Sequence, residues 1–257
     1  MRLLSRIRIV REIDMRFPSL TSRWRDPCRR LPHVMSNTLT VRSVAMLRKA
    51  FGWKKESHLI GDHLEKFDYL EDLNDRRLRD AEIIATVCAN FPARNIVEIG
   101  TAAGRTTALM AVNAPEATIH TVNIHPAEIA KGGRFTTYAP SLDEIGQEYR
   151  NLGLKNIRQI LANTATWCPD ISPIDIAFID GSHDADFVFN DTRLLLKHAA
   201  PGSILMWHDF SPGLCRVYPW IADVCLGVEH LYRKNLIQGR ILHVEDSWIG
   251  LYCVGDP

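Results

Sequence analysis

The chain has 257 residues, of which 46% are hydrophobic and 24% are charged, and its formal net charge is +1. These values are ordinary for a globular protein that buries one full core. No run of eighteen apolar residues occurs, so no membrane-spanning helix is predicted. The six cysteines are scattered and form no C-x-x-C pair, which argues against a disulfide framework or a zinc site and favours reduced thiols in a cytoplasmic protein.

Charge is distributed unevenly along the chain. Residues 1–55 contain fourteen Lys and Arg but only three acidic residues, whereas residues 56–257 are net acidic. The first forty residues mix arginines with prolines and show no sustained hydrophobic period, so we expect a solvated, partly disordered arm. Residues 41–53 fit a short helix. The predicted division is a basic N-terminal arm, 1–55, and one folded domain, 56–257.

Three interpretations of the arm are consistent with its sequence. Its positive charge could bind an anionic surface such as lipid, RNA or an acidic partner. It also has the Arg-rich, acid-poor composition of a transit peptide, although Glu12 and Asp14 weaken that interpretation. The third interpretation is that translation starts later, at Met15, Met35 or Met46.

From about residue 75 onward, strand-like and helix-like runs alternate. The first helix is expected to begin at Asn74 or Asp75 and to stop before Pro92. Strands are then expected at 95–99, 118–123, 157–161, 174–180, 203–208, 240–244 and 248–254, and helices at 104–113, 141–152, 186–198 and 216–233. The last two strands have no helix between them and should form an antiparallel hairpin at one edge. The fold class is therefore α/β, a doubly wound, mostly parallel seven-stranded sheet with a C-terminal antiparallel hairpin.

A glycine-containing turn follows the first strand, where residues 96–107 read I-V-E-I-G-T-A-A-G-R-T-T. Gly100 allows a tight turn, and Gly104 lets the next helix begin close to a ligand, with free N–H groups directed at it. The spacing is neither that of a dinucleotide fold nor that of a phosphate loop. Glu98 suits a ligand that carries an ammonium group. An ordinary turn between a strand and a helix is the alternative.

Polar residues gather at the carboxyl ends of the predicted strands, where a doubly wound sheet binds its ligands. These residues are Glu98, Asn123, Asn163, Thr164, Asp180, His183, His208 and Asp209. Asp180 and Asp209 are expected at adjacent strand ends, with His183 close to both, and this donor set suits a hard ion such as Mg²⁺ or Mn²⁺. The alternative is that Asp180 caps the next helix and that Asp209 only solvates a strand end.

Three segments give the chain a family resemblance: 97–104 (V-E-I-G-T-A-A-G), 178–184 (F-I-D-G-S-H-D) and 201–210 (P-G-S-I-L-M-W-H-D-F). Over residues 75–254 the chain resembles the class I, or seven-strand, S-adenosylmethionine-dependent methyltransferases. Within that class it is similar to the family-24 type, which is related to macrolide-sugar O-methyltransferases and to proteins labelled cephalosporin hydroxylase. The first motif is generic to the class, and the other two together are specific to the family.

The resemblance implies S-adenosylmethionine as cofactor and assigns roles to site residues. The cofactor-binding residues would be Glu98, Gly100, Thr101, Gly104, Asn123, Asn163, Thr164 and Asp180. Glu98, Gly100 and Gly104 would line the methionine part of the cofactor. Asn123 would lie at the ribose, and Asn163-Thr164 at the adenine. Asp180 and Asp209 take the metal positions of the family, and His183 takes the position of the base. Asn123 and Asn163 depart from the family pattern, because acidic residues usually stand at both positions.

The predicted function is O-methylation of a hydroxyl on a sugar or another polar small molecule, with His183 as the base, with or without Mg²⁺ or Mn²⁺. Residues 124–140 are long enough for a lid. The alternative is a non-catalytic module that binds S-adenosylmethionine or a nucleotide and docks through its basic arm. An NAD-dependent oxidoreductase is disfavoured by the glycine spacing. A homo-oligomer is compatible with the sequence.

Overall fold

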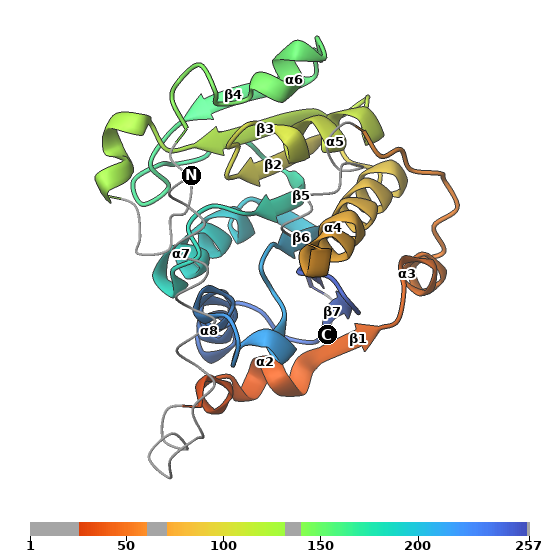
Figure 1. Ribbon diagram of the computed structural model, residues 1–257, viewed down its shortest axis with the longest axis vertical. Coiled ribbons are helices and arrows are strands. Elements are labelled where there is room, and N and C mark those ends of the chain that lie inside the picture. Colours follow the sequence, from red (N-terminus) through yellow and green to blue (C-terminus); the bar gives the residue numbers. More distant parts are fainter. Residues whose placement is uncertain (1–25, 61–70, 132–139, 256–257) are drawn as a thin grey trace.

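The computed structural model describes residues 26–60, 71–131 and 140–255, which form one eight-stranded sheet with helices on both faces (Figure 1). The arm before residue 26 and the predicted lid residues 132–139 lie outside the described residues. The N-terminal elements are η2 (Pro27–Arg30), α2 (Pro32–Asn37), β1 (Thr38–Val41), α3 (Val44–Phe51) and α4 (Glu71–Asn90). The others are β2 (Asn95–Ile99), α5 (Arg105–Asn113), β3 (Thr118–Asn123), η5 (Pro126–Lys131), α6 (Gln147–Asn151), β4 (Ile157–Leu161), β5 (Ile174–Ile179), α7 (Ala185–Leu196), β6 (Ala199–Trp207), η6 (Pro212–Leu214), α8 (Pro219–Arg233), β7 (Ile241–Val244) and β8 (Gly250–Cys253).

The sheet has the order β1-β7-β8-β6-β5-β2-β3-β4, and only β8 runs antiparallel to its neighbours. The mostly parallel α/β fold with its antiparallel C-terminal hairpin is confirmed. The sheet has one strand more than expected, because β1 pairs in parallel with β7, with Thr38 opposite Ile241. The hairpin is therefore not at the edge, as predicted, but between β6 and β1.

The middle of the sheet is buried on both faces, which explains why β5 reads as an apolar run. Ala177 and Ile179 pack into a core with α7 and α8, whereas Ile176 and Phe178 pack into a second core with α4 and α5. Adjacent residues of a strand point to opposite faces, so a central parallel strand needs apolar side chains at nearly every position. This arrangement fixes the carboxyl ends of β2, β3, β5 and β6 at one rim.

Residues 26–41 were expected to belong to a solvated, partly disordered arm, and the structure shows this part of it folded against the domain. These residues form η2, α2 and β1, and α2 packs against α8. The buried carboxylate of Glu229 on α8 accepts hydrogen bonds from the backbone N–H groups of His33 (2.9 Å) and Val34 (3.0 Å). Those two N–H groups belong to the first turn of α2, whose N-cap residue Leu31 has no side-chain acceptor. A partner from α8 thus holds this basic segment on the domain. The predicted short helix is confirmed as α3.

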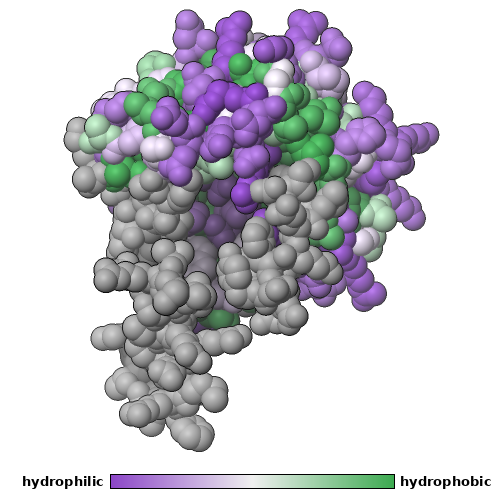
Figure 2. All heavy atoms as spheres, turned by 45° about the horizontal axis from the view of Figure 1, so that its top comes forward, coloured by the Kyte–Doolittle hydropathy of each residue, from purple (hydrophilic) through white to green (hydrophobic). Residues whose placement is uncertain are grey.

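No helix in the described part of the chain is both long and apolar enough to cross a membrane. Figure 2 shows one face of the molecule, on which hydrophilic side chains cover most of the described area and hydrophobic ones occur in small groups. Individually exposed apolar side chains are normal for a folded domain.

Candidate active site

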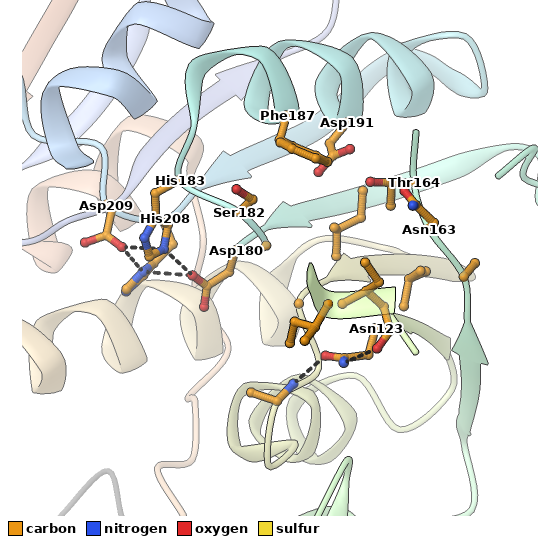
Figure 3. A pocket seen from close by; sticks show the side chains of 18 of the residues that line it. Asn123, Asn163, Thr164, Asp180, Ser182, His183, Phe187, Asp191, His208 and Asp209 are labelled. Carbon is orange, nitrogen blue, oxygen red and sulfur yellow. Dashed lines mark hydrogen bonds and ion pairs between the residues drawn. The ribbon is translucent and has the colours of Figure 1, made fainter. Parts of the chain in front are cut away.

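A cavity of about 460 Å³ opens at the carboxyl ends of the parallel strands. Its lining includes Gly100 after β2, Asn123 at the end of β3, Asn163 and Thr164 after β4, Asp180 and His183 after β5, and His208 and Asp209 after β6. Figure 3 shows Asp180, His183, His208 and Asp209 close together, with Asn123, Asn163 and Thr164 farther along the cavity. A volume of this size is typical of a small-molecule site.

Gly100 lies where the ends of β2, β3 and β5 meet. Its backbone N–H donates to the carbonyl of Val122 (2.8 Å), and its φ of +106° favours glycine. A Cβ atom at this position would lie 2.0 Å from the backbone oxygen of Asp180. The tight turn expected at Gly100 therefore also allows the β5 end, with Asp180, to approach the turn.

Gly104 is the N-cap of α5 and has a φ of +84°, but the structure gives its close approach a different partner. A Cβ atom there would lie 2.7 Å from Cδ1 of Tyr149 and 2.8 Å from Cα of Gly146. Gly146 also donates its N–H to the carbonyl of Ala102 (2.9 Å). The neighbour of Gly104 is thus the segment that precedes and begins α6, not the cavity.

Glu98 and Thr101 lie beneath the glycine turn. The Glu98 side chain is fully buried, and Thr107 and Thr121 donate their hydroxyls to its Oε2 atom. Thr101 and Thr121 share a hydrogen bond of 2.7 Å. Burial raises the pKa of Glu98 to about 8, although both threonine hydrogen bonds oppose this rise, so the carboxyl is mostly neutral at pH 7.

Within the described part of the chain, Glu98, Thr101 and Gly104 are absent from the cavity lining. They support the turn that borders the cavity, and direct contact with a cofactor stays a prediction for them. The five other predicted cofactor-binding residues, Gly100, Asn123, Asn163, Thr164 and Asp180, all line the cavity.

Asn123 lines the cavity, yet its side chain is also bonded to the protein backbone. Its Oδ1 accepts the N–H of Ala102 (3.1 Å), and its Nδ2 donates to the carbonyl of Ile124 (2.9 Å). An aspartate at this position keeps the first contact but has no donor for the second. The amide that replaces the usual acid therefore joins the glycine turn to the loop after β3.

Two carboxylates and two imidazoles converge at the other end of the cavity. Nε2 of His183 lies 3.0 Å from Oδ2 of Asp209 and 3.9 Å from Oδ1 of Asp180. Nδ1 of His208 lies 3.1 Å from Oδ1 of Asp180 and 3.3 Å from Oδ2 of Asp209. The indole N–H of Trp220 donates to Oδ1 of Asp209 (3.3 Å). The expected convergence of Asp180, His183 and Asp209 is thus present in the structure.

The charges in this cluster stabilise one another. Burial alone would raise the pKa of Asp180, but His208 and His183 outweigh it and lower the pKa to about 2. Burial also opposes ionisation of Asp209, yet the same two histidines hold its pKa below its ordinary value. Burial lowers and the carboxylates raise the pKa of both histidines, and the net result is a raised pKa for each. Asp180 and Asp209 are therefore ionised at neutral pH.

Four further residues belong to this end of the cavity: His208, which the sequence placed at this rim without a role, and Asp80, Trp220 and Trp248, which were not predicted as site residues. His208 lies between the two carboxylates, and its Nε2 atom is 3.5 Å from Oδ2 of Asp80 on α4. Trp220 and Trp248 line the cavity beside the cluster. His208 is adjacent to Asp209 in the 201–210 motif, so a role in the site could have been proposed for it from that position. Asp80 lies on a helix far from the other residues in sequence, and no local pattern marks it.

Asp209 has a φ of +54°, which is uncommon for a residue other than glycine. Backbone strain of this kind tends to occur at functional sites, where surrounding contacts maintain it. Asp180, His183 and Asp209 each offer one ligand atom, and these atoms lie within 4.8 Å of one another. The donor set, two carboxylates and an imidazole, fits a divalent cation.

Comparisons with known proteins agree with the fold. Residues 97–210 match a family described as a methyltransferase domain. The structure of the O-methyltransferase NovP is 14% identical, with a TM-score of 0.54, and the alignment covers 71% of this chain and 81% of NovP. The methyltransferase PaMTH1 of Podospora anserina, solved with S-adenosylhomocysteine bound, is 18% identical, with a TM-score of 0.53, over 85% of this chain and 98% of PaMTH1. No curated protein sequence is a significant match.

The structural likenesses show the fold, and the family match covers the segment from the β2 strand to the end of the β6 motif. The chain therefore has the α/β fold of these methyltransferases, and its residues 97–210 match the methyltransferase domain family.

Proposed function

We propose that this methyltransferase methylates a hydroxyl group of a polar small molecule, with a sugar as the preferred class of acceptor, and that His183 removes the hydroxyl proton. The observation that carries the proposal is the contact of 3.0 Å between Nε2 of His183 and Oδ2 of Asp209 at one end of the cavity. An imidazole held by a carboxylate is the usual arrangement for a general base.

The part of the cavity next to Gly100 suits the cofactor. Asn163 and Thr164 offer polar groups at one end, and the ionised carboxylate of Asp180 offers a negative charge nearer the histidines. S-adenosylmethionine supplies a methyl group on a positively charged sulfur, and its charge is complementary to that carboxylate. The neutral amide of Asn123 would face the ribose without charge assistance.

The part of the cavity next to Asp209 suits the acceptor. Trp220 and Trp248 line it, and aromatic rings offer flat apolar contact area next to polar groups. The indole N–H of Trp220 is already bonded to Asp209, so this ring is fixed relative to the carboxylate. A ring that carries hydroxyl groups can therefore pack against tryptophan while one hydroxyl reaches His183.

His183 is oriented for proton transfer by its neighbours. Its Nε2 faces Asp209, whereas its Nδ1 is buried and has no hydrogen-bond partner among the described residues. If Nε2 carries the hydrogen, the lone pair on Nδ1 is free to accept a proton. A divalent cation held by Asp180 and Asp209 would lower the pKa of an acceptor hydroxyl bound to it. Positioning and exclusion of water would supply the rest of the rate enhancement.

The first test is calorimetry with S-adenosylmethionine and, separately, with NAD. We expect binding of the former alone, and binding of NAD alone would contradict the cofactor assignment. Transfer of a labelled methyl group is then measured with hydroxyl-bearing sugars and simple polyols. Cofactor binding without transfer to any acceptor would favour the non-catalytic alternative.

The second test replaces His183 by alanine. Turnover should fall by about 10²–10⁴-fold while the affinity for S-adenosylhomocysteine stays within about twofold, because the loss of a general base acts on the chemical step. His198→Ala is the matched control, since His198 precedes β6 at the end of that strand opposite His208. Full activity of the His183→Ala protein would refute the assigned base.

A further inference from the structure

We propose that His208, and not His183, is the nitrogen donor of a divalent cation site formed with Asp180 and Asp209, and that Asp80 holds His208 in the orientation this role requires. The inference rests on the proposed function in one respect, since it leaves His183 free to act as the base. Its test measures cation binding and does not depend on methyl transfer.

The position of His208 relative to the two carboxylates is the first argument. Its Nδ1 is close to one oxygen of each carboxylate, 3.1 Å from Asp180 and 3.3 Å from Asp209. His183 is less evenly placed, because its Nε2 lies 3.0 Å from Asp209 but 3.9 Å from Asp180. The dashed lines in Figure 3 join both histidines to both carboxylates, and the line between His183 and Asp180 marks the longest of the four contacts. A cation that bridges the two aspartates would therefore have the His208 nitrogen beside it.

The state of that nitrogen is the second argument. Nδ1 of His208 is buried and has no partner with hydrogen-bond geometry among the described residues. A buried polar atom without a hydrogen bond is costly in a folded protein, and a missing ion is one explanation. The side chain of Asp209 is 8% exposed, so this donor is also shielded from solvent.

Asp80 provides the third argument. Its Oδ2 lies 3.5 Å from Nε2 of His208, and its Oδ1 accepts the backbone N–H of Trp248 (2.7 Å). Asp80 is therefore fixed through Oδ1, and its Oδ2, a buried atom without a hydrogen bond among the described residues, faces the far nitrogen of the imidazole. A carboxylate behind a metal-binding histidine keeps the hydrogen on the far nitrogen and turns the lone pair of the near nitrogen towards the metal. Asp80, on α4, would act through His208 as a positioning residue and would not touch the cation.

The experiment is a titration of the full chain with Mn²⁺ after treatment with a chelator. Free Mn²⁺ is followed by electron paramagnetic resonance, and the bound ion is examined for coupling to imidazole nitrogen. Wild-type protein should bind one Mn²⁺ per chain and show one imidazole nitrogen. His208→Ala should weaken binding by at least tenfold, and Asp80→Asn should weaken it by about 10–100-fold. His183→Ala should change the affinity by less than about threefold, and so should the control His198→Ala.

Several outcomes would overturn the inference: no binding of Mn²⁺ by the wild type, no imidazole nitrogen at the bound ion, or a larger loss in His183→Ala than in His208→Ala. The nitrogen coupling is measured on wild-type protein, so the test stands even where a variant fails to fold. Calorimetry with S-adenosylhomocysteine on the same samples separates the two proposals. Intact cofactor binding without a cation site would remove this inference and leave the proposed methyl transfer.

Discussion

The attachment of residues 26–41 to the domain can be tested by replacing Glu229. The buried carboxylate of Glu229 accepts from the N–H groups of His33 and Val34, from Nδ1 of His33 (2.7 Å) and from Nε of Arg233 (3.0 Å). Glu229→Ala leaves two donors of the α2 first turn without an acceptor, at about 1–3 kcal/mol for each one that stays buried. We therefore expect a loss of ~3–5 kcal/mol in the free energy of unfolding, as for other broken buried pairs.

The assay is urea unfolding followed by tryptophan fluorescence. Glu229→Gln keeps an oxygen for the backbone donors and should lose less, and Glu116→Ala, at an exposed position, should change stability by less than ~0.5 kcal/mol. The pKa of Glu229 is lowered: burial opposes this, but His33, Val34 and Arg233 outweigh it. The contribution of Glu229 is therefore present above the ordinary carboxyl pKa and is lost as the pH falls through the lowered value. A loss below ~1 kcal/mol in Glu229→Ala would refute the role given to this contact.

Three more predictions concern the site. The first concerns Glu98, whose pKa is raised to about 8. As the pH rises from about 5 to about 8, the free energy of unfolding of the wild type should fall relative to that of Glu98→Gln, by up to ~1.4 kcal/mol per pH unit. Urea titrations over this range measure the difference, and parallel curves for the two proteins would contradict the prediction. Gly100→Ala should lower the affinity for S-adenosylhomocysteine more than tenfold in calorimetry, whereas Gly153→Ala, which also has a positive φ but open space, should not. Asn123→Asp should weaken cofactor binding in the same assay, because it loses the donor to Ile124, and tighter binding would show that a ribose contact dominates.

The sequence by itself determined the strands and the rim at which the site lies. The predicted runs 95–99, 118–123 and 157–161 match β2, β3 and β4 in both bounds. Strands of this kind are recognisable because burial on one face requires alternating apolar residues, and burial on both faces requires a continuous apolar run. Once the strands are placed, the convergence of Asp180 and Asp209 follows from the parallel order of β5 and β6, since their carboxyl ends share one rim.

Only the tertiary structure decided which partners those residues have. β1 has four residues with little side-chain burial, so its backbone pairing with β7 left no hydrophobic pattern to detect. Glu229 and His33 are 196 positions apart, and Asp80 reaches His208 from another helix. Hydrophobic periodicity reports the local environment of a segment, whereas these contacts depend on how helices pack across the sheet. The same packing directs Gly104 towards Tyr149 and joins the Asn123 side chain to two loops, which residue type and spacing do not encode.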